Sequence, residues 1–233
     1  MATQTLDRPP ATPRRRRGAP FWIGVALVLA GLVLLGYVGW QFFGTNVVSH
    51  RKQQQIIEQT EREWSQGSSG IGTATGNGDR LKGAQALVRI PKFGRDYVVP
   101  VQAGVSPDVL AEGFGHFAGS VGPGRVGNYA IAGHRVTHGE PLREMPSLRP
   151  GDKVVVETRN RTYTYELDTD PNDLVVTFND VWVIAKQPRN PDGGVQPAQR
   201  PGQRLITLTT CAELFHTDNR MIVFGHLVDT APR

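Results

Sequence analysis

The chain has 233 residues, and its 26 lysines and arginines against 21 acidic residues give a net charge of +5. A basic chain can bind nucleic acid, but four of these arginines form one run at residues 14–17, and the others are spread along the chain. No RNP, zinc-finger or helix-turn-helix pattern accompanies them, so the charge does not indicate a nucleic-acid-binding protein.

Residues 21–43 contain no charged side chain. As a helix they would extend roughly 34 Å, which is enough to cross a hydrocarbon core of about 30 Å. Trp22 near one end and Tyr37 and Trp40 near the other fit the aromatic belts of a membrane interface. The segment therefore predicts a transmembrane helix. The alternative is a cleaved signal peptide, but the apolar run is longer than an h-region and no clear small-x-small site follows it.

The charges that flank this segment predict its orientation. Four arginines precede it, whereas only Arg51 and Lys52 follow closely, so the positive-inside rule places the N-terminus in the cytoplasm. Residues 50–64 are polar and compatible with a helix, and residues 67–83 are rich in Gly, Ser and Thr, as flexible linkers are. The expected organisation is a cytoplasmic basic tail (1–20), a transmembrane helix (21–43), a stalk and flexible linker (44–84) and an extracytoplasmic domain (85–233).

The C-terminal domain is predicted to consist mainly of strands. Short segments rich in Val, Ile, Thr and Tyr alternate with turn signals, and Asn160-Arg161 is typical of a tight hairpin turn. Many short strands with little helix favour a mainly β fold, a closed β-barrel of about eight strands with short helices, because closure removes exposed edges. The expected strands are 86–90, 97–101, 128–132, 153–158, 162–167, 181–185, 204–210 and 221–228, and the expected helical turns are 107–112 and 141–148.

Cys211 is the only cysteine of the chain and follows the apolar start of an expected strand. Extracytoplasmic cysteines usually form disulfides. A single thiol in that compartment has no partner within the chain, which makes it a candidate nucleophile. The alternative is a small buried apolar residue, since free cysteines are among the most buried residue types.

Two further residues are candidates for the same site. His134 follows the expected strand 128–132, and Arg220 begins the strand after Cys211. If the two C-terminal strands pair as an antiparallel hairpin, Cys211 and Arg220 face each other across its base. A thiolate can then act as nucleophile, an imidazole can transfer protons, and a guanidinium can stabilise an oxyanion. A histidine that only bonds a loop and an arginine that is only solvated remain alternatives.

Two segments and one further residue resemble a known family. Residues 207–211, Thr-Leu-Thr-Thr-Cys, resemble the TLxTC signature of sortases, the cysteine transpeptidases that attach proteins to bacterial cell walls. Residues 128–135 are similar to the segment that carries the family's catalytic histidine, and Arg220 matches its arginine position. The similarity covers about residues 85–228. The Gly-His-Arg and Thr-Thr-Cys motifs are most like those of the actinobacterial class E group.

The resemblance implies a sortase-type barrel and a transpeptidation that needs no cofactor, and it indicates no metal-ligating residues. Cys211 would attack the Thr carbonyl of an LPxTG-like or LAxTG-like C-terminal sorting signal and release the Gly-containing tail. An amine of a peptidoglycan precursor, or a pilin lysine, would then resolve the thioacyl enzyme. His134 would be the acid and then the base, Arg220 would hold the carbonyl or oxyanion, and Thr210 would contact the signal. The partners implied are surface proteins that carry such signals.

Other classes of protein fit the sequence less well. The Ser-His-Gly-Cys type motif of L,D-transpeptidases is missing, and a papain-like cysteine begins a long helix, whereas Cys211 follows a strand. A metal site formed by Cys211, His216 and His226 would lack the closely spaced ligand pairs of familiar zinc sites. The non-enzymatic alternative is an anchored barrel that binds wall or protein ligands, with Cys211 merely packed.

Overall fold

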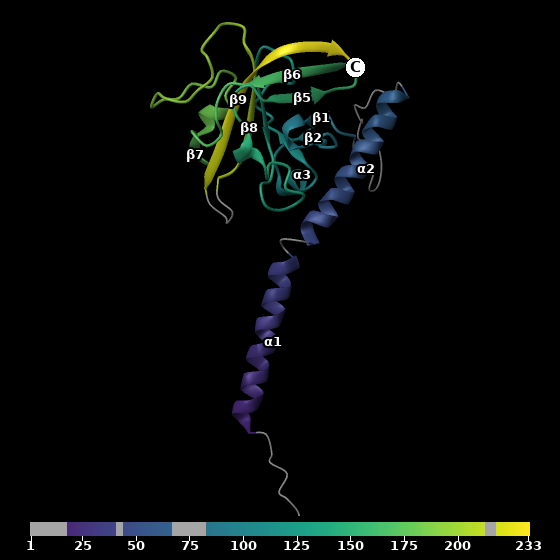
Figure 1. Cartoon of the computed structure of the whole chain (residues 1–233), viewed down its shortest axis with the longest axis vertical. Coiled ribbons are helices and arrows are strands. Elements are labelled where there is room, and N and C mark those ends of the chain that lie inside the picture. Colours follow the sequence, from purple (N-terminus) through teal and green to yellow (C-terminus); the bar gives the residue numbers. More distant parts are fainter. Residues whose placement is uncertain (1–17, 41–43, 67–82, 213–217) are drawn as a thin grey trace, which may run out of the picture. The chain divides into compact units, whose positions relative to one another are not determined.

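The computed structural model describes residues 18–40, 44–66, 83–212 and 218–233, and it divides into two units, Met1–Trp40 and Gln41–Arg233. The described part of the first unit is one helix, α1 (Ala19–Gly39), drawn in purple in Figure 1. None of its residues is buried, and within the described ranges it alone is long and apolar enough to cross a membrane. This helix fits the predicted single-pass anchor.

The described part of the second unit contains one further long helix and nine strands, connected by short helical turns. Its predominance of strand confirms the predicted mainly β fold. The helices and helical turns are α2 (Thr45–Ser65), η2 (Pro91–Phe93), α3 (Pro107–Ala111), η3 (Met145–Ser147) and η4 (Val181–Ile184). The strands are β1 (Ala86–Arg89), β2 (Val99–Ala103), β3 (Phe114–His116), β4 (Gly127–Ala132), β5 (Lys153–Glu157), β6 (Arg161–Leu167), β7 (Val175–Thr177), β8 (Arg204–Cys211) and β9 (Asn219–Pro232).

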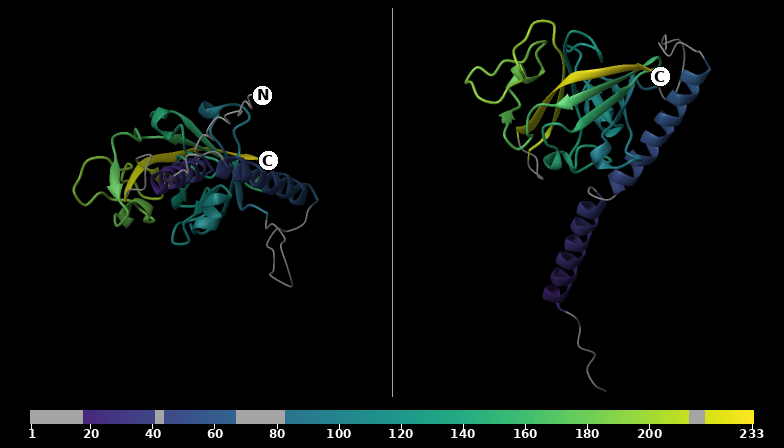
Figure 2. Two further views of the ribbon diagram at one scale, coloured as in Figure 1. Left: turned by 90° about the horizontal axis from the view of Figure 1, so that it is seen from below. Right: turned by 45° about the horizontal axis from the view of Figure 1, so that its top comes forward.

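Eight of the strands close into a barrel, as predicted. They follow the order β6-β5-β1-β2-β3-β4-β8-β9, and β6 also pairs with β9, so the sheet returns to its first strand. Figure 2 shows this barrel from two further directions. The pairs β2–β3 and β4–β8 are parallel and the other pairs are antiparallel. The short strand β7 adds to the N-terminal half of β9, whose C-terminal half pairs with β6.

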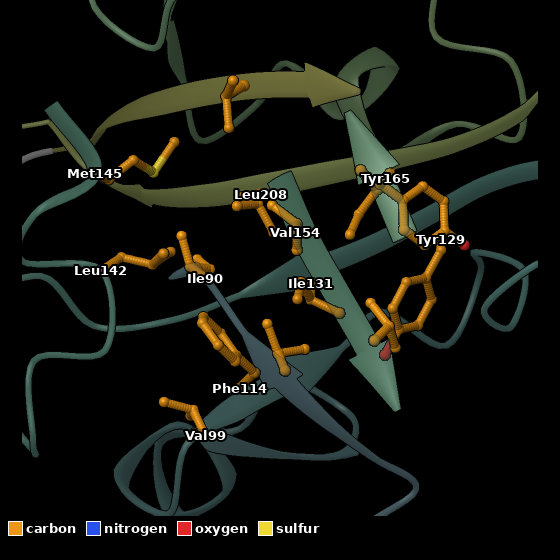
Figure 3. Close-up of a cluster of buried hydrophobic side chains, with 14 of the residues drawn as sticks. Ile90, Val99, Phe114, Tyr129, Ile131, Leu142, Met145, Val154, Tyr165 and Leu208 are labelled. Carbon is orange, nitrogen blue, oxygen red and sulfur yellow. The ribbon is translucent and has the colours of Figure 1, made fainter. Parts of the chain in front are cut away.

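A cluster of buried apolar side chains fills the barrel and fixes the strands that carry the site (Figure 3). Ile131 of β4 and Leu208 of β8 are fully buried in it. Burying one such side chain stabilises the fold by roughly 1.5–3 kcal/mol. The outer face of β8 and β9 is also covered, by a second cluster in which Val176 and Val183 pack on Ile222 and Phe224. β8 is therefore buried on both faces.

A polar network joins the outer faces of β4 and β8 to this outer layer. The Thr207 hydroxyl donates to Asn128 Oδ1 at 2.8 Å, and Asn128 Nδ2 donates to the carbonyl oxygens of Val183 and Ala185 at 3.2 and 3.1 Å. Asn128 and Thr207 are both fully buried. Because buried polar groups are costly unless they are hydrogen-bonded, this network selects the register in which β4 and β8 pair.

One predicted strand is wrong, and two short strands were not predicted. Residues 181–185 were expected to be a strand because they are rich in Val and Ile, but they contain the helical turn η4. Burial of Val183 and the bonds from Asn128 outweigh the strand propensity of this segment. The unpredicted strands β3 and β7 have three residues each and carry little pattern. The other seven predicted strands are present with shifted ends, and the hairpin turn at 158–161 is confirmed.

The segment expected as a stalk contains α2, and α2 packs against the barrel. Ile56 and Ile57 are buried against Ala84 and Leu87, and Thr60 Oγ1 accepts a hydrogen bond from the amide of Ala84 at 2.8 Å. The sequence predicted the helical character of this region but not its packing on the barrel. The Gly/Ser-rich part, residues 67–82, lies outside the described residues.

Candidate active site

The β8–β9 hairpin brings Cys211 and Arg220 together. Both residues occupy one register position of the antiparallel ladder, with Cys211 at the end of β8 and Arg220 at the start of β9. This pairing was predicted from the spacing of the two residues. Side chains alternate along a strand, so Cys211 lies on the same outer face as Thr207 and Thr209. The Cys211 thiol is free and half-buried.

The parallel pairing of β4 with β8 places His134 at the same end of the barrel. Ala132 of β4 is the register partner of Thr209, and the Gly133 amide donates to the Thr209 carbonyl oxygen at 3.1 Å. His134 follows Gly133 directly. His134 is thus the second residue after Ala132, and Cys211 is the second residue after its register partner Thr209. The structure therefore brings the three predicted residues to one edge of a single sheet.

Gly133, between β4 and His134, lies too close to the Phe114 ring for a residue with a side chain. A Cβ atom at Gly133 would lie 2.8 Å from ring carbons of Phe114, which is itself fully buried in the core. Any larger residue would therefore move either the ring or the backbone that carries His134. The position of the histidine is thus tied to the core packing.

Thr210 links the histidine strand to the cysteine strand. Its side chain is only 3% exposed, and its hydroxyl donates to the Gly133 carbonyl oxygen at 2.8 Å. Alternation directs it to the face opposite to that of Cys211. A contact between Thr210 and a substrate remains a prediction, whereas its bond to the residue before His134 is part of the structure.

Arg135 makes a second link, which the sequence analysis missed. Its guanidinium Nη1 donates to the carbonyl oxygen of Cys211 at 3.4 Å and to that of Ala212. The residue directly after the candidate base thus holds the backbone of the candidate nucleophile. The only sequence signal was its position next to His134, since neither spacing nor charge indicates which carbonyl groups it contacts.

Arg220 of β9 is the register partner of Cys211 on β8 and of Val176 on β7. Its Nη1 donates to the carbonyl oxygen of Asn219 at 2.9 Å, and its guanidinium carbon lies 5.3 Å from the centre of the Phe178 ring. This distance is within the range of a cation–π contact. Phe178 is 68% exposed, so it presents an apolar surface to solvent beside the guanidinium. No sequence pattern indicated Phe178.

His138 packs directly against His134. The two imidazole rings are stacked, with centroids 4.8 Å apart and planes inclined by 29°. Burial lowers the pKa of His138, which favours its neutral form at neutral pH. A neutral ring does not repel His134 when the latter is protonated, so the stack is compatible with both protonation states of His134.

The alternative metal site is not compatible with the strand register. Cys211 pairs with Arg220, whereas His226 pairs with Leu205 at the other end of β8. Six residues of strand separate the two positions, roughly 20 Å at the rise of a β-strand, and metal ligands bind within a few ångström of each other. His226 instead contacts Asp168 at 2.7 Å. His216 lies outside the described residues.

The chain is similar to known proteins in sequence and in fold. A family model described as a sortase domain matches residues 88–228. Sortase SrtE1 of Streptomyces coelicolor is 36% identical over 220 residues, an alignment that covers 91% of this chain and 58% of that protein, so the chain spans less than two thirds of this relative's length. The structure of sortase E from Streptomyces avermitilis is 38% identical with a TM-score of 0.55, covering 64% of this chain and 90% of that one.

A further similar structure is sortase E1 from Streptomyces coelicolor, which holds a tripeptide in its active site. It is 35% identical with a TM-score of 0.53 and covers 64% of this chain and 91% of that one. The matched residues 88–228 include β8, the part of β9 up to residue 228 and the β4–His134 segment. The chain belongs to the sortase family. Its solved structural neighbours include class E sortases.

The link from Arg135 to the end of β8 is testable without a substrate. Arg135→Ala removes the donor to the Cys211 and Ala212 carbonyl groups, so amide hydrogen exchange at 209–212 should rise about three- to tenfold, as the loss of about one hydrogen bond predicts. Arg125→Ala, at an exposed arginine in the loop before β4, is the control. Exchange could be followed by mass spectrometry, and equal protection in both variants would show that the bond does not hold this backbone.

Proposed function

We propose that the chain is a sorting-signal transpeptidase that uses Cys211 as nucleophile, His134 as acid and base, and Arg220 as the donor to the oxyanion. The observation that carries this proposal is the shared register position of Cys211 and Arg220 beside the strand that leads into His134. A thiol, an imidazole and a guanidinium at one edge are the groups that acyl transfer through a thioester needs. Membership of the sortase family supports the same reaction.

The first half-reaction releases the tail of the substrate. The thiolate of Cys211 attacks the Thr carbonyl carbon of an LPxTG-like or LAxTG-like signal, and Arg220 donates hydrogen bonds to the oxygen that becomes negative. The tetrahedral intermediate then collapses and the Thr–Gly bond breaks. His134 gives its proton to the leaving Gly amine. The product is a thioester between Cys211 and the substrate protein.

The second half-reaction transfers the protein to a new amine. The amine attacks the thioester, His134 takes the proton that the amine loses, and the thiolate of Cys211 leaves as the new amide forms. The acceptor is an amine of a peptidoglycan precursor or a pilin lysine, and the donors are surface proteins that carry the signal. The peptide nature of the substrate is supported by the tripeptide in the active site of Streptomyces coelicolor sortase E1.

α1 would place this reaction at the membrane surface. We infer a cytoplasmic N-terminus and an extracytoplasmic barrel, because four arginines precede α1. Protease added to intact protoplasts should then remove the barrel domain while a cytoplasmic marker survives. Protection of the barrel under these conditions, with degradation only after lysis, would reverse the orientation.

Replacing the nucleophile should separate folding from activity. Cys211→Ala should abolish both cleavage of a signal peptide and transfer to an added amine, because the covalent intermediate cannot form. Cys211→Ser should be nearly inactive, since an alcohol is far harder to ionise than a thiol. Product formation by mass spectrometry with a small library of signal peptides, and circular dichroism of each variant, would measure both effects. Substantial transfer by a folded variant contradicts the role of Cys211.

The role of Arg220 can be separated from its charge. If Arg220 presents a fork of donors to the oxyanion, Arg220→Lys keeps the charge but loses the geometry, so kcat/KM should fall about 10²- to 10³-fold, nearly as far as in Arg220→Ala. Single-turnover rates of the two variants and the rate of Cys211 alkylation measure this. A lysine variant with nearly full activity would show that charge alone suffices.

A further inference from the structure

The loop that follows His134 has an unusual backbone at three consecutive residues. His138, Gly139 and Glu140 all have positive φ angles, of 54°, 81° and 49°. Glycine adopts this left-handed conformation readily, but residues with a Cβ atom do so only at a cost in free energy. Such a conformation persists where surrounding contacts fix it. Contacts with the surrounding structure should therefore hold this turn.

Two polar side chains of α2 hold the outer side of this turn. Asn46 Oδ1 accepts a hydrogen bond from the Gly139 amide at 2.9 Å, and Asn46 Nδ2 donates to the carboxylate of Glu140. Gln53, two helical turns further on, donates from Nε2 to the His138 carbonyl oxygen at 3.5 Å. Each of the three left-handed residues therefore contacts one of two side chains on a single face of α2.

Gln53 is buried where it contacts this turn. It is only 4% exposed, although glutamine is normally a surface residue in a helix. A Cβ atom at Gly139 would lie 2.7 Å from Gln53 Nε2, so the helix and the turn are already in close contact. Gln54 and Gln55, its neighbours in the sequence, are exposed. The burial of one glutamine among three identical residues points to a specific role for Gln53.

The inner side of the same turn reaches the active-site histidine. The His138 ring stacks on the His134 ring, and the carbonyl oxygen of His134 accepts a hydrogen bond from the amide of Leu142 at 3.0 Å. Leu142 is fully buried, which fixes the far end of the loop. A continuous set of contacts thus runs from α2 through His138 to the imidazole of His134.

We propose that Asn46 and Gln53 are positioning residues for His134. They hold the left-handed turn so that the His138 ring restrains the His134 imidazole in the orientation needed for proton transfer. The barrel from residue 85 onward is then an incomplete catalytic unit, because α2, which follows the anchor helix α1 in the sequence, completes the site. The effect on catalysis rests on the proposed function of His134, whereas the effect on the loop does not.

The three glutamines provide a matched experiment on the full chain in detergent. Gln53→Ala should raise amide exchange at 137–142 about tenfold and lower kcat for peptide transfer about tenfold, with KM changed less than about twofold, since the loop positions a base and not the peptide. Gln54→Ala and Gln55→Ala make the same chemical change on the exposed face and should match the wild type in both measurements.

A charge exchange tests Asn46. Asn46→Asp places a carboxylate against that of Glu140 and should lower kcat, whereas Glu140→Gln alone still accepts from Asn46. In the double variant Asn46→Asp with Glu140→Gln, the new amide donates to the new carboxylate, and kcat should recover to within about threefold of the wild type. Rescue of kcat with an unchanged KM is expected of a positioning contact. Failure of the double variant to recover contradicts the role of Asn46.

The outcomes distinguish this inference from the proposed function. If the wild-type chain transfers no signal peptide, the proposed function fails, and loop exchange still decides whether α2 orders the turn. If Gln53→Ala equals Gln54→Ala in exchange and in kcat, the positioning role is overturned. If Gln53→Ala lowers the unfolding temperature and leaves the protection of 137–142 and kcat unchanged, α2 is a general brace, and the positioning role is overturned in that case too.

Discussion

The site depends on the register of β8 between β4 and β9. β8 pairs in parallel with β4 and antiparallel with β9. The C-terminal end of β8 therefore lies beside the C-terminal end of β4 and the N-terminal end of β9. His134, Cys211 and Arg220 then share one edge although they are far apart in the sequence. A slip by one residue would turn Cys211 to the opposite face, because side chains alternate with a period of two.

The composition of β8 follows from this register. An exposed strand shows one polar face. β8 instead has the barrel core on one side and, on the other, the second apolar cluster, which includes Val183 of η4. Ile206 and Leu208 fill the core, while Thr207 bonds to Asn128 on the outer side. A slipped strand would place the Thr207 hydroxyl in the core without its partner, at a cost of about 1–3 kcal/mol. The threonines thus help to keep Cys211 on the outer face.

The sequence predicts the barrel and the Cys211–Arg220 pair because both rest on local patterns. Two strong strands joined by one loop pair as a hairpin, and the spacing sets which residues meet. His134 was a candidate because it also follows a buried strand, but its arrival at the same end of the barrel needs the parallel β4–β8 pairing, which no local pattern encodes. The contacts of Arg135 and Gln53 could not be predicted, because they depend on tertiary packing. α2 is rich in polar residues, so its sequence alone predicts a stalk. Its packing on the barrel follows only from the structure.

If Cys211 carries the substrate as a thioester, this species can be trapped on the chain. The full chain would be incubated with a signal peptide without an amine acceptor, quenched in acid and digested for mass spectrometry. We expect release of the Gly-containing tail and a mass gain on the peptide containing Cys211 that equals the acyl fragment ending in Thr. Rapid cleavage without an adduct, or an adduct on another residue, would contradict it.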